Sequence, residues 1–204
     1  MAKIKLTKNE LKKQKDALKM YRRYLPTLML KKQQLQAEIR LTEIRLRELR
    51  EERDRVADEL NSWIAVFGER GIFTPDILKI SEIKTAQGNI AGVAIPLFEG
   101  AEFEIFPYDL ARLPLWLDLA VEKLKLLLLL DIESRIVEEQ RRRLDHELRI
   151  TTQRVNLFEK VKIPETRENI RKIQVYLGDQ QTAAVVRGKI AKRGLARAAQ
   201  GGTA

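Results

Sequence analysis

The chain offers few side chains for catalysis or metal binding. His146 is its only histidine, and it stands between Asp145 and Glu147. A lone histidine among charged neighbours is typical of a solvated or ion-paired position on a helix surface. The chain has no cysteine, which excludes disulfides and thiolate metal sites. We therefore predict no catalytic residue, no metal site and no cofactor.

The densest group of acidic residues points to the same conclusion. Between residues 50 and 59, carboxylates alternate with arginines. Alternating charge is typical of an exposed, salt-bridged helix face rather than of acid/base catalysis. The sequence also lacks G-x-x-x-x-G-K-[ST], the motif of the loop that cradles nucleotide phosphates. The chain is thus predicted not to be an enzyme, and to act through binding or mechanics.

Charge is distributed unevenly along the chain, whose net charge is +10. Residues 1–32 hold eleven Lys and Arg against Glu10 and Asp16, and residues 187–204 hold five with no acid. Residues 68–110 instead hold seven acidic side chains and three basic ones. If the two ends meet in space, they form one strongly positive surface. Such a surface favours an acidic partner.

Two long heptad patterns must position these charges. With Leu11 at position a, the a positions are Leu11, Leu18, Leu25, Lys32, Ile39, Leu46, Arg53, Leu60 and Phe67, and the d positions are Gln14, Tyr21, Leu28, Leu35, Thr42, Leu49, Val56 and Trp63. A period of 3.5 residues sustained this long predicts a supercoiled helix.

The second pattern starts near Leu113 and changes phase near Pro164. Beyond this proline, Ile170, Ile173 and Leu177 are displaced by one residue from the earlier register. Proline removes a backbone donor and clashes with the preceding turn, so we expect a break near 163–165.

The segment between the helices carries strand and turn signals. Residues 80–86 and 90–97 resemble two short strands around Gln87-Gly88-Asn89, and Pro96 marks a strand end or an edge position. The predicted organisation is a first helix over 1–67, a β-containing module over 68–112, a second helix over 113–198, and a disordered tail over 199–204. The predicted fold is all-α, a long antiparallel two-helix coiled-coil hairpin with a small β-hairpin insertion between the helices.

Two stretches carry a resemblance to a known family. Residues 153–164 read Q-R-V-N-L-F-E-K-V-K-I-P, and residues 28–35 read L-M-L-K-K-Q-Q-L. Both resemble segments of the D subunit of the V-type and A-type rotary ATPases. The order of long helix, short β insertion, long helix and basic C-terminus is similar too.

The resemblance implies a rotor axle that turns inside a ring of nucleotide-binding A and B subunits. It further implies contacts with the F subunit and with the C/d adaptor subunit of the membrane rotor, and contact with the membrane only through these partners. The matching and basic positions are the candidate partner-binding residues: Lys31, Lys32, Arg53, Arg154, Asn156, Glu159, Pro164, Arg187, Lys189, Lys192 and Arg193. We expect a cytoplasmic location, peripheral at the membrane, and no nucleic-acid partner.

Two other functions agree with parts of the sequence. A coiled-coil scaffold or tether would account for the heptads, although not for residues 153–164 or the β insertion. A nucleic-acid-binding coiled coil would account for the basic ends, since lysines and arginines neutralise phosphates. Against the latter, Tyr21 and Tyr24 are the aromatic residues interleaved with these basic stretches, so stacking platforms are few.

Overall fold

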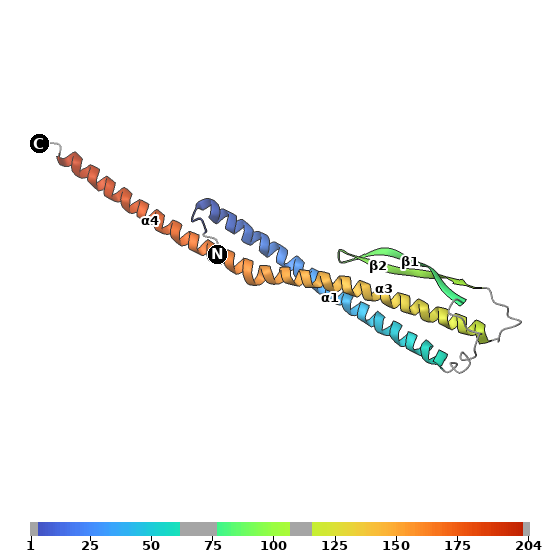
Figure 1. Cartoon of the computed structure of the whole chain (residues 1–204). Helices are drawn as coiled ribbons and strands as arrows, with labels where there is room; N and C mark the ends of the chain where they lie inside the picture. Colours follow the sequence, from blue (N-terminus) through green and yellow to red (C-terminus); the bar gives the residue numbers. More distant parts are fainter. Residues whose placement is uncertain (1–3, 62–76, 107–115, 202–204) are drawn as a thin grey trace. The chain divides into compact units, whose positions relative to one another are not determined.

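A computed structural model describes residues 4–61, 77–106 and 116–201 of the chain (Figure 1). The elements are helix α1 (Lys8–Asn61), strands β1 (Leu78–Ile90) and β2 (Val93–Ile105), helix α3 (Trp116–Asn156), the π-helical turn η2 (Leu157–Lys162) and helix α4 (Ile163–Gly201). They fall into two units. Unit 1 contains residues 4–30 and 152–201, and unit 2 contains the described part of residues 31–151.

Helix α1 begins at a capping sequence and follows the predicted heptads. The hydroxyl of Thr7 accepts a hydrogen bond from the Glu10 amide at 3.3 Å, which satisfies one of the free N–H groups of the first turn. The helix continues through Pro26. Its buried residues are Leu35, Ile39, Thr42, Leu46, Leu49 and Val56, every one at a predicted a or d position. The predicted seam is thus confirmed within unit 2.

Unit 2 is a pair of helices with a two-stranded sheet beside them. Leu46, Leu49 and Val56 of α1 pack with Leu130 and Val137 of α3 in one apolar cluster. In a second cluster, a strand residue joins the two helices: Ile95 packs with Leu35, Ile39 and Leu144. The hairpin therefore lies along the helix pair, as Figure 1 shows, and completes its core.

The sheet is a single antiparallel hairpin whose turn lies later than predicted. Its register runs from Leu78↔Ile105 to Ile90↔Val93, so the turn residues are Ala91 and Gly92. Both have positive φ (52° and 80°), and the Gly92 amide donates to Asn89 Oδ1 at 2.9 Å. This is the geometry that two-residue hairpins favour. The predicted turn at residues 87–89 is wrong.

Gly88 misled the prediction because it serves packing rather than turning. A Cβ atom at this position would approach Leu97 Cδ1 to 2.8 Å, so a larger residue would force the Leu97 side chain to move, and glycine allows the close approach. Pro96 lies inside β2, opposite Gln87. Both strands of a two-stranded sheet are edge strands, so a proline can be accommodated within β2. The Pro96 carbonyl accepts a hydrogen bond from Gln140 Nε2 at 2.6 Å, which ties β2 to α3.

Unit 1 pairs the first part of α1 with α3's last residues, η2 and α4. The buried positions on the second helix are Thr151 at the unit boundary and Val155, Ile163, Thr166, Asn169 and Ile173. The α1 positions of this unit (Leu11, Gln14, Leu18, Tyr21, Leu25 and Leu28) are half-buried. The rings of Tyr21 and Phe158 meet with centroids 5.1 Å apart. Beyond Leu177, α4 is exposed through Ala196 and continues past the start of α1 (Figure 1).

The one-residue phase change has a local cause in η2. The amide of Ile163 donates to the carbonyl of Phe158, five residues earlier, which is π-helical hydrogen bonding. A π turn accommodates one additional residue within a helix. Ile163 is therefore buried where the earlier register would place Lys162. The chain stays helical through Pro164, and the irregularity precedes the proline instead of spanning residues 163–165.

The fold class is confirmed: two long helical stretches flank a small β-hairpin. Of the predicted segment ends, residues 62–67 lie outside the described residues. Residues 199–201, expected in the tail, belong to α4, and residues 202–204 also lie outside the described part.

Candidate partner-binding surfaces

The described residues contain no group of three or more His, Cys, Asp or Glu side chains that could hold a metal ion. None of the described helices is long and apolar enough to cross a membrane. The predicted partner-binding residues lie on the helices, and we describe the surfaces that they form.

Two of the predicted binding residues face partners inside unit 2. Lys31 Nζ contacts Glu147 Oε1 at 2.7 Å, from α1 to α3. Arg53 Nε contacts Asp131 Oδ1 at 2.7 Å across the same helix pair. The hydrogen bond and the charge of Asp131 raise the pKa of Arg53 above its ordinary value. Arg53, at a heptad a position of the seam, is thus neutralised by an ion pair within unit 2. Lys32, at another a position, is half-buried and forms no ion pair with another described residue.

A second set of predicted residues surrounds the π turn. Arg154 and Asn156 lie in the last turn of α3, Glu159 lies in η2, and Pro164 is the second residue of α4. All four are exposed. Leu157 and Val161 add apolar surface to this region, with 44% and 49% of their area exposed. The turn that resets the helix register is therefore surrounded by side chains available to a partner.

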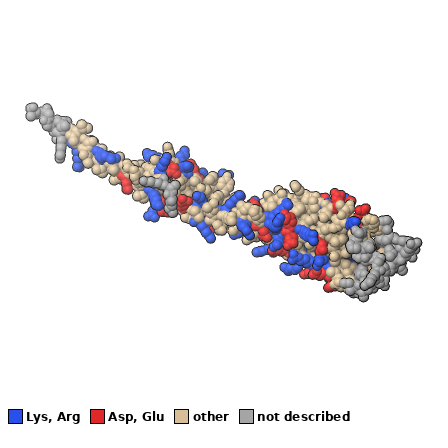
Figure 2. Space-filling view, in the orientation of Figure 1, with Lys and Arg blue, Asp and Glu red and all other residues tan. Residues whose placement is uncertain are grey.

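The third set lies on the free segment of α4, which we define as residues 178–196. Arg187, Lys189, Lys192 and Arg193 are exposed and form no ion pair with any residue that the structure describes. Asp179 is the only acidic residue of this segment. The charged side chains along this end of α4 are mostly Lys and Arg in Figure 2, whereas the surface of unit 2 shows both signs interleaved. Exposed Val185, Ile190 and Leu195 lie between the charges.

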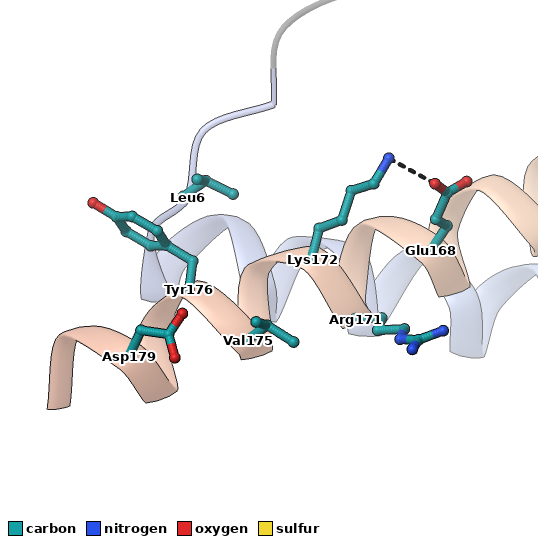
Figure 3. Close-up of a pocket in the computed structure, with 7 residues that line it drawn as sticks. All are labelled: Leu6, Glu168, Arg171, Lys172, Val175, Tyr176 and Asp179. Atoms are coloured by element: carbon teal, nitrogen blue, oxygen red, sulfur yellow. Dashed lines mark ion pairs between the residues drawn. The ribbon is translucent and has the colours of Figure 1, made fainter. Parts of the chain in front are cut away.

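Unit 1 also contains an open groove of ≈ 580 Å³ along α4. It is lined by Leu6, Glu168, Arg171, Lys172, Val175, Tyr176 and Asp179 (Figure 3). Leu6 comes from the segment before α1 and lies next to the Tyr176 ring, while Lys172 Nζ contacts Glu168 Oε1 at 2.6 Å. The hydrogen bond and charge of Lys172 lower the pKa of Glu168. The groove is shallow and holds a mixture of apolar and charged side chains.

Comparison of the sequence with known proteins shows which family the chain is related to. A family model described as the ATP synthase D subunit matches residues 10–193. The chain is 52% identical over 195 residues to a V-type ATP synthase D subunit of Borreliella burgdorferi, covering 96% of each chain. It is 34% identical to the V-type ATP synthase D subunit of Chlamydia muridarum, covering 93% of this chain and 95% of the relative.

This chain belongs to the ATP synthase D subunit family. The resemblance seen in residues 28–35 and 153–164 is thereby confirmed, and both stretches lie inside the matched region. The matched region also includes the β-hairpin, the π turn and the four basic residues of the free α4 segment.

Some surface features of this family member escaped the sequence prediction. The groove residues Leu6, Val175 and Tyr176 belong to no heptad seam, so the period-based prediction ignored them. The exposed apolar residues Leu41 and Ile44 of α1 were also overlooked. The signal that could have found them is their position on the helix face opposite the seam, where polar residues are the rule.

Proposed function

We propose that this chain is the central rotor axle of a V/A-type rotary ATPase. It transmits torque between ATP hydrolysis or synthesis in the catalytic hexamer and ion translocation in the membrane ring. The observation that carries this proposal is the match to a V-type ATP synthase D subunit over nearly the whole of both chains. Its construction supports the role, because helices packed along an apolar seam resist bending and twisting better than a single helix.

The proposed partners follow from the role and from the surfaces. The nucleotide-binding A and B subunits would surround the free α4 segment, whose unpaired basic residues favour acidic loops in the bore. The F subunit and the C/d adaptor subunit would bind other parts of the shaft. The exposed residues Arg154, Asn156, Glu159 and Pro164 are candidate contacts around the π turn.

The axle itself performs no ATP chemistry in this proposal. It has no phosphate-binding loop, and it would act in the cytoplasm, reaching the membrane only through its partners. The purified chain should therefore hydrolyse no ATP, while ATP-driven ion pumping by the complex should require it.

Rotation tests the proposal directly. Because the chain has no cysteine, Ser81→Cys creates a single attachment point on an exposed residue of β1. A bead attached there should turn in one direction when ATP is added to a complex whose hexamer is immobilised. A bead on one of the hexamer proteins is the control and should stay still. A stationary bead on position 81, in a complex that hydrolyses ATP at the normal rate, would contradict the proposed role.

A further inference from the structure

The face of α1 opposite the seam carries a second heptad pattern. Within unit 2, Gln34, Ala37, Leu41 and Ile44 alternate at spacings of three, four and three residues. We call these four residues the outer stripe. They lie at heptad positions c and f, which point away from the partner helix in a two-stranded coiled coil. Alternation by three and four is the spacing that lets one helix pack lengthwise against another.

Packing within the chain leaves the outer stripe uncovered. Leu41 is 60% exposed and Ile44 is 48% exposed, and Gln34 and Ala37 are exposed as well. By contrast, Leu46 and Leu49 on the seam are 5% and 0% exposed. Large aliphatic side chains at c and f positions therefore contribute little to the stability of unit 2.

The outer stripe ends at charged residues toward the C-terminus of α1. Further along the same face, the c and f positions are Glu48, Glu51, Arg55 and Asp58, all charged and exposed. The face thus changes from uncharged to fully charged between Ile44 and Glu48. Depletion of charge is the compositional signal of an interface core. Within unit 2 the uncharged c and f positions span about three turns, roughly 15 Å, a length that a helix can cover.

Two unpaired arginines border the outer stripe on one side. Arg40 and Arg47 occupy successive b positions, beside Leu41 and Ile44, and both are exposed. Neither forms an ion pair with another residue in the described part of the chain, although Arg45 nearby pairs with Glu133 at 2.6 Å. A binding partner that placed carboxylates along this border would complete both charges.

We infer that the outer stripe is the docking face for an amphipathic helix of another protein of the rotary complex. The partner helix has an apolar stripe with heptad spacing and acidic residues along the border that meets Arg40 and Arg47. It would add a third helix to the α1–α3 pair. This inference rests on the proposed rotor function and specifies one partner surface of the rotor.

A second copy of this chain fits the outer stripe less well. In an antiparallel pairing of two outer stripes, flanks of the same type face one another. Arg40 and Arg47 of one copy would then face the same arginines of the other, and such like-charge contacts are unfavourable. The border charge therefore favours an acidic partner over self-association.

Photo-crosslinking in the assembled complex tests the docking face. A benzoylphenylalanine residue replaces Leu41 or Ile44, and the matched control replaces Glu51, which lies one heptad beyond Ile44 on the charged face. Crosslinks from positions 41 and 44 should map to one helix of another protein of the complex, with apolar residues spaced by three and four and acids beside them. Crosslinks to a second copy of this chain, to a segment without that pattern, or at no more than the control yield would overturn the inference.

Substitution provides a second, quantitative test on the same complex. Leu41→Lys combined with Ile44→Lys should weaken binding of the crosslinked partner by about tenfold or more, the effect of losing a central apolar contact. Glu51→Lys combined with Asp58→Lys should leave that affinity unchanged. All four positions are exposed, so the melting temperature of the free chain should stay near that of wild type. Equal affinities for the two double variants would refute the inference.

The charge border has its own readout. Arg40→Glu with Arg47→Glu should weaken the same binding and reduce its dependence on salt, because the attraction has been removed. Unchanged affinity and salt dependence would mean that no acidic helix lies at this border. ATP-driven bead rotation of the wild-type complex is measured separately. Rotation combined with negative binding results would therefore reject the docking face and retain the rotor function.

Discussion

The same heptad pattern of α1 is buried to different degrees in the two units. In unit 2, its seam residues Leu35, Leu46 and Leu49 are at most 5% exposed. In unit 1, the equivalent residues Leu11, Leu18 and Leu25 are only half-buried. Register alone therefore does not decide burial, because the sequence pattern continues unchanged from one unit to the next.

The residues that face the seam explain the difference. In unit 2 the opposing side chains are aliphatic, such as Leu130, Val137 and Leu144, and the strand residue Ile95 covers one layer. In unit 1 the second helix presents Thr166 and Asn169 as buried polar residues, and α1 presents Gln14. Unit 2 also buries two polar residues, Thr42 and Thr151, but among a larger set of buried aliphatic side chains. A polar seam gains less from burial, so unit 1 should contribute less to stability and open before unit 2.

The largest expected effect comes from placing a charge in the seam of unit 2. Leu49→Glu buries an unpaired carboxylate at a fully buried site and should destabilise the chain by several kcal/mol. Leu18→Glu in unit 1 should cost far less, because water reaches this half-buried position. Thermal unfolding followed by circular dichroism measures both. Equal melting temperatures for the two variants would remove the contrast between the units.

Truncation to alanine should show the same contrast at smaller amplitude. Leu49→Ala leaves a cavity among Leu46, Val56 and Leu130, with an expected loss of about 2–5 kcal/mol. Leu18→Ala should cost about half as much or less, since its area is already partly exposed. Urea unfolding gives both free energies. A larger loss for Leu18→Ala would place the main core in unit 1.

Replacing the buried amide side chain of unit 1 should reduce the difference in stability between the two units. Asn169 is 9% exposed, and Asn169→Leu exchanges its amide for apolar surface in the seam. We expect a gain of about 1 kcal/mol, because a polar seam residue is retained at a cost in stability. Asn156→Leu, at an exposed position beside the π turn of the same unit, is the control and should change the stability little. Hydrogen exchange of α4 amides would show whether the gain is confined to unit 1.

Acid should produce the smallest effect, in both units. Hydrogen bonds from Arg142 and Arg143 lower the pKa of Glu139, and Lys172 lowers that of Glu168, from an ordinary value of 4.5. A carboxylate with a lowered folded-state pKa stabilises the fold above its unfolded pKa, and this contribution is lost as pH falls through the folded pKa.

Glu139 is half-buried and Glu168 is exposed, so water reaches both carboxylates, and the melting temperature should fall only slightly below about pH 4.5 on their account. Glu139→Gln should reduce this acid dependence more than Glu168→Gln, because two arginines hold Glu139 and one lysine holds Glu168. If Glu168→Gln has the greater effect, the single lysine pair of unit 1 is the stronger one.

The seam was predictable because its signal is repeated many times. Every buried residue of α1 lies at a position that the heptads assigned, and Ile173 follows the displaced register assigned beyond Pro164. The depth of burial was not predictable from the same pattern. The depth of burial depends on the side chains that pack in each seam, such as Asn169 in unit 1 and Ile95 in unit 2.

Local features with a single signal were predicted less well. Gly88 was assigned to a turn because glycine commonly marks turns, yet it lies in a strand beneath Leu97. Arg53 occupies a polar a position, and its ion-pair partner Asp131 is 78 positions away, so only the fold brings the two together. The hairpin's attachment to α3 through Gln140 likewise depends on a backbone carbonyl, which leaves no trace in residue type.

The π turn at Leu157–Lys162 is a position where the helix can lose one residue without changing the facing of the residues that follow. Each residue of an α-helix rotates the rest of the helix by about 100°, so removing a residue elsewhere in α3 or α4 turns the next seam residues away from α1. Removing exposed Lys160 instead converts the π turn to a regular α-helical turn, and Ile163 and Ile173 keep their facing. Chimeric shafts joined inside this turn can thus differ by one residue in length, whereas chimeras joined anywhere else must preserve the heptad count.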